Sequence, residues 1–229
     1  MQDNEGYSIS LESYPLQKLQ DRLAHIHLSA SQKILRENLN DRFQTLQELG
    51  IQNLRQLQVA LKDKKALVAF ARQSGLPQEY LTVLRRWVNG YMLKPIPLAD
   101  FPPADRAAVA TLEEMGIKGT LQLFPRVRTP KARACLAAES GIDPEEILKL
   151  TKLTDLARLK WVGPKFAHLL LVSGFDTVEK VAHADGIALY HHLQKVSAES
   201  GVYSGGFSED DINLWVQYIV CDVPLSIVY

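Results

Sequence analysis

An internal repeat constrains the fold of this chain more than any other feature of its sequence. The segment that begins at Thr45, TLQELGIQNLRQLQ, aligns with TLEEMGIKGTLQLF from Thr111 at an offset of 66 residues. The alignment continues without a gap over 40 positions, of which 14 are identical. A repeat of this length indicates supersecondary units placed in tandem along the chain.

A third and more divergent copy follows the first two. LLLVSGFDTVEKVA, at residues 169–182, matches the sequence around the first repeat glycine of the other copies. A second glycine follows 25 residues later in the first two copies and 27 later in the third, which gives the pairs Gly50–Gly75, Gly116–Gly141 and Gly174–Gly201. The first and third copies also share their final pattern of Trp-Val, Tyr and Pro-Leu, at residues 87–98 and 215–225.

The repeated unit has helical periodicity. Leucines recur at helical spacing, and the alternation typical of strands is nearly absent. Gly50 follows the last periodic leucine of its segment, where a left-handed helix C-cap favours glycine. Ser29, Thr177 and Ser208 each precede a predicted helix and fit the N-cap position. We therefore expect an all-α chain of about 11 to 14 short helices, with few or no strands.

A proline-rich segment, residues 95–103 (PIPLADFPP), forms the clearest joint in the chain. Proline interrupts helices and stiffens a connection. We predict an N-terminal helical half, residues 1–98, with the first repeat, and a C-terminal half, residues 99–229, with the second and third. The glycine-rich loop at residues 201–208 is the candidate mobile segment.

The charge of the chain is balanced overall but uneven along its length. Its 229 residues include 26 Lys and Arg against 26 Asp and Glu, which argues against a protein that coats nucleic acid by bulk charge. Residues 115–138 and 156–175 contain no acid, whereas residues 176–229 contain eight acids and two lysines. If the basic segments share a face, phosphate is attracted there; the alternative is that their charges lie on separate solvated faces.

No pattern typical of catalysis, cofactor binding or metal binding is present. The glycine-rich phosphate loop, the dinucleotide fingerprint, the serine nucleophile elbow and the zinc-protease helix are all missing. The paired histidines have no cysteine or carboxylate at ligand spacing: His25, His27, His191 and His192. An enzyme would need a pocket that gathers His168, His183 or an acid pair. We expect no enzyme activity, no metal and no cofactor.

Two further features bear on localisation. Cys135 and Cys221 are isolated and far apart, which fits a reducing cytosol. The start, MQDNEGYSIS, lacks the basic and apolar regions of a signal peptide. The apolar C-terminal stretch INLWVQYIVCDVPLSIVY is too short and polar to span a bilayer. We expect a cytoplasmic protein that does not enter a membrane.

The most informative segment is LARLKWVGPKFAHLLLVSGFDTVEKVA, residues 156–182. It resembles the helix-hairpin-helix motif, in which two helices flank a turn of the type apolar-Gly-apolar-Gly-Pro-Lys with an alanine two residues later. The resemblance implies that Val162 is buried, that Gly163 lies at the sharp bend, that Pro164 takes the first helical position and that Ala167 allows close helix packing.

Such a turn is suited to phosphate. Free backbone N–H groups and the dipole at a helix N-terminus hold a phosphate oxygen without reading a base, and Lys165 adds a charge-assisted contact. Trp161 replaces the first glycine of the motif, so its side chain is left either to pack into the core or to stack on a base. The turns around Leu39-Asn40 and Asp105-Arg106 lack Gly-Pro-Lys, and we interpret them as structural.

The resemblance extends beyond this motif. The runs LREN, YLTVLRRWVNGYMLKPIPLADFP and DLARLKWVGPKFAHLLLVSGFDTVEKVA resemble an uncharacterised family of bacterial proteins, a domain of unknown function built from tandem helix-hairpin-helix-like repeats. The resemblance covers nearly the whole chain from Pro15. It implies an all-α repeat fold and a bacterial cytosol, and it implies no enzyme activity.

These observations lead to two hypotheses. The first is a non-enzymatic module that binds the phosphate backbone of DNA or RNA independently of sequence. Its candidate residues are Arg158, Lys160, Trp161, Val162, Gly163, Pro164 and Lys165 in the hairpin and Arg126, Arg128, Lys131 and Arg133 in the preceding basic segment. The second is a helical protein–protein interaction scaffold in which the hairpins are only structural.

Overall fold

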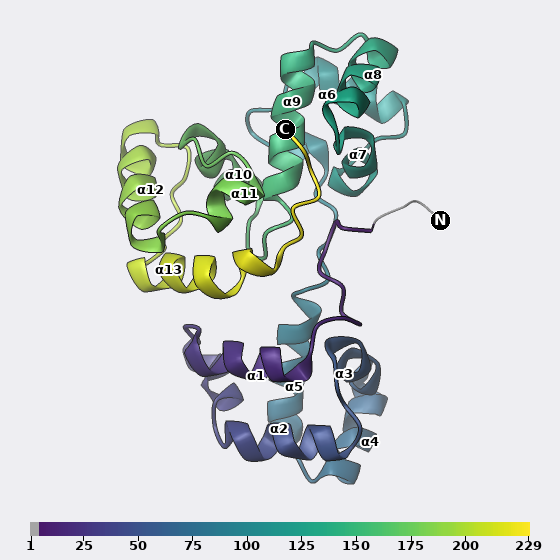
Figure 1. Cartoon of the computed structure of the whole chain (residues 1–229), viewed down its shortest axis with the longest axis vertical. Helices are drawn as coiled ribbons and strands as arrows, with labels where there is room; N and C mark the ends of the chain where they lie inside the picture. The colour runs from purple at the N-terminus through teal and green to yellow at the C-terminus, as the bar shows by residue number, and fades with distance from the viewer. Residues whose placement is uncertain (1–4) are drawn as a thin grey trace. The chain divides into compact units, whose positions relative to one another are not determined.

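The computed structural model describes residues 5–229 and shows an all-α chain (Figure 1). Over these residues it has thirteen α-helices and three short 3-10 helices, and its β-structure is limited to two isolated bridges. The predicted all-α fold is therefore confirmed. Residues 1–4, the start of the segment tested for a signal peptide, lie outside the described residues. None of the helices described is both long enough and apolar enough to cross a membrane.

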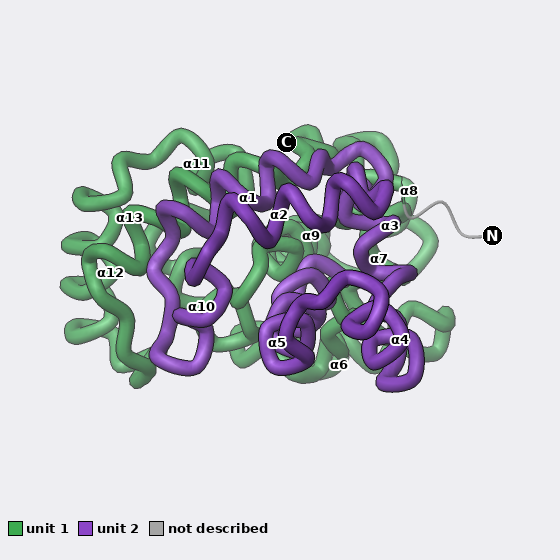
Figure 2. Tube along the Cα trace, turned by 90° about the horizontal axis from the view of Figure 1, so that it is seen from below, with its two compact units in different colours: residues 1–8, 93–229 green, residues 9–92 purple. Residues whose placement is uncertain are grey.

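The chain divides into two compact units, one of residues 9–92 and one that joins residues 5–8 to residues 93–229 (Figure 2). The sequence prediction placed the boundary at residue 98. In the structure residues 93–98 belong to the larger unit, where Pro97 forms a β-bridge with Gly119. Residues 5–8 join the same unit because Tyr7 packs edge-on against Phe124, with ring centroids 5.2 Å apart.

The smaller unit contains the first repeat, preceded by one further helix. Its elements are α1 (Leu16–His25), a 3-10 helix (Ala30–Leu35), α2 (Leu39–Glu48), α3 (Leu54–Ala60), α4 (Lys64–Ser74) and α5 (Gln78–Asn89). Apolar side chains from several helices are fully buried in its core, among them Leu19, Phe43, Leu57, Tyr80 and Leu84. The amphipathic helices predicted from leucine spacing thus bury their apolar stripes against one another.

The larger unit contains the second and third repeats. The second repeat consists of α6 (Arg106–Glu114), α7 (Thr120–Val127), α8 (Pro130–Ser140) and α9 (Pro144–Leu156). The third consists of α10 (Pro164–Val172), α11 (Val178–Ala182), α12 (Gly186–Ser200) and α13 (Glu209–Tyr218). Short 3-10 helices, Leu98–Asp100 and Val220–Asp222, flank this pair of repeats.

Helix order and helix termini repeat as the sequence does. Each repeat has four helices, and its two glycines lie after the first and third of them. All six repeat glycines have a left-handed backbone, with φ between +66° and +84°. The predicted N-caps are also present. Thr177 accepts a hydrogen bond from the Lys180 N–H, and Ser29 and Ser208 each begin a capping box. These local features could be predicted from the sequence because they depend on residues that are close together along the chain.

A buried guanidinium holds together distant parts of the larger unit. Arg158, 1% exposed, lies just beyond the end of α9. Its Nη1 donates to Oδ1 of Asp155 at 2.7 Å, its Nε donates to the Tyr7 carbonyl at 3.2 Å, and its Nη2 donates to the Pro224 carbonyl. One side chain therefore joins α9 to both the N-terminal and the C-terminal segments of this unit.

The carboxylate of Asp155 completes the network. Its Oδ2 accepts hydrogen bonds from the Val178 N–H at the start of α11 (2.9 Å) and from the Tyr229 hydroxyl (3.1 Å). Burial raises the pKa of Asp155, although Arg158 and these donors act in the opposite direction, and burial lowers the pKa of Arg158. The pair is thus costly to desolvate, and it depends on complete hydrogen bonding.

Replacing Arg158 with methionine is expected to lower the free energy of unfolding by about 3–5 kcal/mol, because the Asp155 carboxylate would remain buried without its cation. Urea-induced unfolding followed by tryptophan fluorescence measures the change. The double variant Asp155→Asn/Arg158→Met removes both charges and should recover part of the loss. Arg72→Met, an exposed arginine of the other unit, is the control, and an equal effect of the two single substitutions would contradict the assignment.

Candidate nucleic-acid interface

The candidate site is the turn between α9 and α10, residues 157–163, with the first turn of α10. After α9 ends, the chain closes tight turns through the Leu159 N–H, which donates to the Leu156 carbonyl, and the Val162 N–H, which donates to the Leu159 carbonyl, both at 3.0 Å. Val162 is 6% exposed and Ala167 is fully buried, as the motif implies. Pro164 takes the first helical position, which is also as expected.

The sharp bend lies at Trp161 and not at Gly163. Trp161 has a φ of +73°, the left-handed conformation that costs an L-residue about 1–2 kcal/mol. Gly163 is the N-cap of α10 and has an extended backbone, with φ −91° and ψ 176°. The expectation for Gly163 was therefore wrong. The backbone at Trp161 therefore has the left-handed conformation expected for the first glycine of the motif, although the residue is a tryptophan.

The Trp161 side chain lies on the surface. It is 57% exposed, which rules out the packing into the core that the sequence left open. The Nζ of Lys160 lies 4.9 Å from the centroid of its ring, close enough for a cation–π contact. An indole therefore projects at the bend that leads into α10.

Three backbone N–H groups at the start of α10 have no acceptor. In the described part of the chain, no hydrogen bond is donated by the N–H of Gly163, Lys165 or Phe166, and Pro164 has no N–H. A Cβ placed on Gly163 would meet no atom within 4 Å, so the space beside this residue is open. The positive end of the helix dipole favours an anion here, and exposed Lys165 adds a charge.

Most other helices of the chain use a side chain at this position. The N-cap side chain accepts a backbone hydrogen bond at the start of α3, α4, α6, α8, α9, α11, α12 and α13, through Asn53, Asp63, Asp105, Thr129, Asp143, Thr177, Asp185 and Ser208. Helix α10 begins with a glycine that has no such side chain, and its first turn contains no acid. Its amides are thus left for an external acceptor.

Two candidates in this turn do not reach the surface. Arg158 is held in its buried ion pair. Lys160 is 5% exposed, its carbonyl accepts a hydrogen bond from the Trp215 Nε1 at 3.1 Å, and burial lowers its pKa to about 7. Both residues were predicted to contact phosphate, and the burial of their side chains removes them from that role.

The basic residues at 126–133, which span the end of α7 and the start of α8, mostly contact other parts of the protein. Arg126 forms an ion pair with Glu139. Arg128 donates to the Ser226 carbonyl at 3.4 Å, and Arg133 donates to the Val228 carbonyl at 2.8 Å, so both hold the C-terminal segment. Of the four candidates here, Lys131 is exposed and has no such bond to the rest of the described chain. Sequence reasoning could not anticipate the bonds of Arg128 and Arg133 to the C-terminal segment, because these two acceptors lie more than 90 residues away.

Charge is divided between the two units. Residues 9–92 contain twelve Lys and Arg against seven Asp and Glu, whereas residues 93–229 contain fourteen against seventeen. The α9–α10 turn thus belongs to the unit with the acidic balance. An anion bound here is held by close contacts with N–H groups and Lys165 and gains little from the field of the whole unit.

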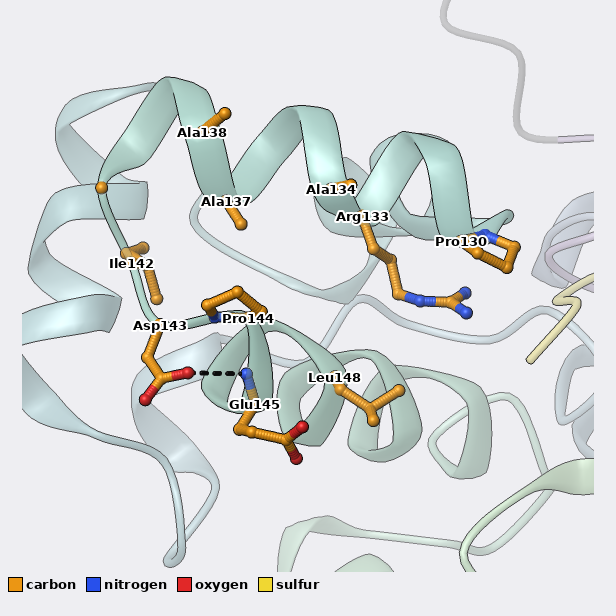
Figure 3. A pocket seen from close by; sticks show the side chains of 11 residues that line it. Pro130, Arg133, Ala134, Ala137, Ala138, Ile142, Asp143, Pro144, Glu145 and Leu148 are labelled. Carbon is orange, nitrogen blue, oxygen red and sulfur yellow. Dashed lines mark hydrogen bonds between the residues drawn. The ribbon is translucent and has the colours of Figure 1, made fainter.

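A groove between α8 and α9 is a separate feature of the second repeat (Figure 3). Its volume is about 650 Å³, and its lining is mostly apolar: Ala134, Ala137, Ala138, Ile142, Pro144 and Leu148. Arg133 lies near one end, and Asp143 and Glu145 lie near the other (Figure 3). The histidines considered for an enzyme, His168 and His183, do not line it. Over residues 5–229 no group of three or more His, Cys, Asp or Glu is placed to hold a metal ion.

Comparison with known proteins gives one match. The model of a family described as a domain of unknown function, DUF4332, matches residues 102–219, slightly more than half of the chain. The match spans the second and third repeats, with the α9–α10 turn inside it. No curated protein and no solved structure matches the chain significantly.

The burial of Lys160 is expected to lower the free energy of unfolding by an amount that depends on pH. Its pKa falls from 10.5 to about 7 on folding, so between these values the unfolded chain binds one more proton than the folded chain. Stability therefore rises with pH in this window by about 1.4 kcal/mol per pH unit from this group, and below pH 7 the full cost of the buried charge is present. Lys160→Met is expected to be more stable than wild type at pH 6, with a difference that narrows toward pH 10.

Urea unfolding of both proteins at a series of pH values measures this difference. Lys131→Met, which removes an exposed lysine of the same unit, should show no such trend. A stability difference for Lys160→Met that does not change between pH 7 and pH 10 would contradict the shifted pKa.

Proposed function

The chain belongs to the DUF4332 family, a domain of unknown function, and we propose that it binds nucleic acid through the phosphate backbone at the α9–α10 turn. The observation that supports this proposal best is the group of three N–H donors without an acceptor beside exposed Lys165. Donors of this kind position a phosphate and carry no sequence information, so the binding is sequence-independent. No catalytic step is part of the proposal.

The small size of the site sets the expected strength of binding. One lysine and one helix N-terminus contact one or two phosphates, and the unit that carries them has an acidic balance. The logarithm of the binding constant should therefore fall by only about one to two units for each tenfold rise in salt. Binding of this kind is weak and is best measured at low ionic strength.

We also propose the setting in which this function acts. The α9–α10 turn resembles a divergent helix-hairpin-helix motif, and we take the bacterial cytoplasm as the compartment in which it acts. Both cysteines, Cys135 and Cys221, are exposed and unbridged, which fits a reducing compartment.

A protein-interaction scaffold is the second candidate, and the apolar α8–α9 groove favours it. An exposed apolar groove with charges of opposite sign at its two ends suits an amphipathic peptide segment. The two candidates differ in a simple measurement, because a scaffold would not bind oligonucleotides even at low salt.

Lys165→Glu is expected to weaken oligonucleotide binding about tenfold or more, because it removes a charge-assisted contact and places a carboxylate beside the open N–H groups. Fluorescence anisotropy of a labelled 20-nucleotide strand in about 20 mM salt measures the affinity. Lys195→Glu makes the same charge change at an exposed position on α12 and should alter binding by no more than about twofold. Equal affinities of wild type and Lys165→Glu would exclude the turn from binding.

A further inference from the structure

We propose that Trp161 makes the α9–α10 turn selective for single-stranded nucleic acid by stacking on a base next to the bound phosphate. This inference rests on the proposed function, since it assigns a specificity to the same site. The chemistry recognised is an unpaired nucleobase attached to a phosphate, which single-stranded DNA and RNA share.

The exposure of Trp161 sets it apart from the other tryptophans. Trp87 and Trp215 are 4% and 5% exposed and fill the cores of their units, whereas Trp161 is 57% exposed. Tryptophan is usually buried over most of its surface, and here it also occupies a left-handed position that glycine would take without strain. The turn itself therefore does not require an indole at this position, and more than half of the side chain is open to solvent.

The ring lies close to the side chain of the preceding residue. The Lys160 Nζ lies 4.9 Å from the ring centroid, and the Lys160 carbonyl accepts a hydrogen bond from the indole N–H of Trp215. Trp161 is two residues from Gly163, the first of the open N–H donors. One short segment thus supplies both an aromatic surface and an anion-binding group. These are the two features needed to bind a nucleobase and its adjoining phosphate.

Further aromatic rings surround the same helix start. Phe166, which carries one of the open N–H groups, packs on Tyr203, Phe207 and Trp215 with centroid distances of 5.2, 5.8 and 6.0 Å. Tyr203 and Phe207 belong to the glycine-rich 201–208 loop and are only partly buried. A strand that leaves the phosphate site therefore meets further aromatic surface.

Stacking on Trp161 favours single strands for a geometric reason. In a duplex both faces of each base are covered by neighbouring pairs, whereas in a single strand a base can turn out and stack on a side chain. A glycine at position 161 would let a rigid duplex backbone approach closely, and the indole obstructs that approach. The same residue thus adds affinity for one form and removes access for the other.

The test compares wild type with Trp161→Gly, which suits the positive φ and should fold at least as well. Binding of labelled dT20, rU20 and a 20-base-pair duplex is measured by anisotropy at low salt. Wild type is expected to prefer the single strands. Trp161→Gly should bind them about tenfold more weakly, about 1.4 kcal/mol, and it should bind the duplex more tightly than wild type because the indole no longer obstructs the approach. Trp161→Phe should retain part of the affinity, and Ile187→Ala, an exposed apolar control in the same unit, all of it.

Intrinsic fluorescence gives an independent readout, because Trp161 is the one tryptophan of the three that is exposed. Stacking by dT20 should quench the emission of wild type and leave that of Trp161→Phe unchanged. If Trp161→Gly binds single strands as wild type does while Lys165→Glu fails to bind, the role of Trp161 is overturned and the phosphate site stands. If no nucleic acid binds wild type, both proposals are overturned.

Discussion

The buried ion pair of Arg158 with Asp155 fixes the geometry on which the candidate site depends. Asp155 lies in the last turn of α9, and Arg158 is the second residue of the turn that follows. Because both side chains are fully bonded, to the N-terminal segment, to α11 and to the C-terminal segment, the start of the α9–α10 turn has one allowed position. Burial acts against the charged form of both groups, so we see the pair as a source of geometric definition more than of net stability.

The fold could be predicted from the sequence to the extent that it depends on near neighbours. The all-α class follows from leucine spacing, and the left-handed glycines and the N-caps at Thr177 and Ser208 depend on residues within one helical turn. The site was less predictable. The sequence suggests free positive charge at three arginines, Arg158, Arg128 and Arg133. In the structure each of them donates a hydrogen bond to a carbonyl between 66 and 151 residues away. Such partners are set by the tertiary fold and leave no local pattern.

Trp161 is informative because it departs from the helix-hairpin-helix motif that the turn resembles. Trp161 replaces the first glycine of the motif, although tryptophan rarely adopts a positive φ. The structure shows that the backbone keeps the glycine conformation and that the indole is directed to the surface. The departure therefore changes the chemistry presented at the turn and preserves its shape. In the proposed mode of binding, short-range stacking and hydrogen bonding would compensate for the weak long-range attraction of a unit whose charge balance is acidic.

A comparison of the three repeats also explains why we expect an anion-binding site in one of them and not in all three. The helix equivalent to α10 in the second repeat, α6, begins at Asp105, whose carboxylate accepts a hydrogen bond from the Ala108 N–H at 2.8 Å. That N–H is occupied, and the carboxylate repels a phosphate. The equivalent helix in the first repeat, α2, carries Asp41 in its first turn. Helix α10 combines a glycine N-cap with an acid-free first turn and Lys165. The copies therefore share a scaffold, and the residues at the start of one helix decide which copy can hold an anion.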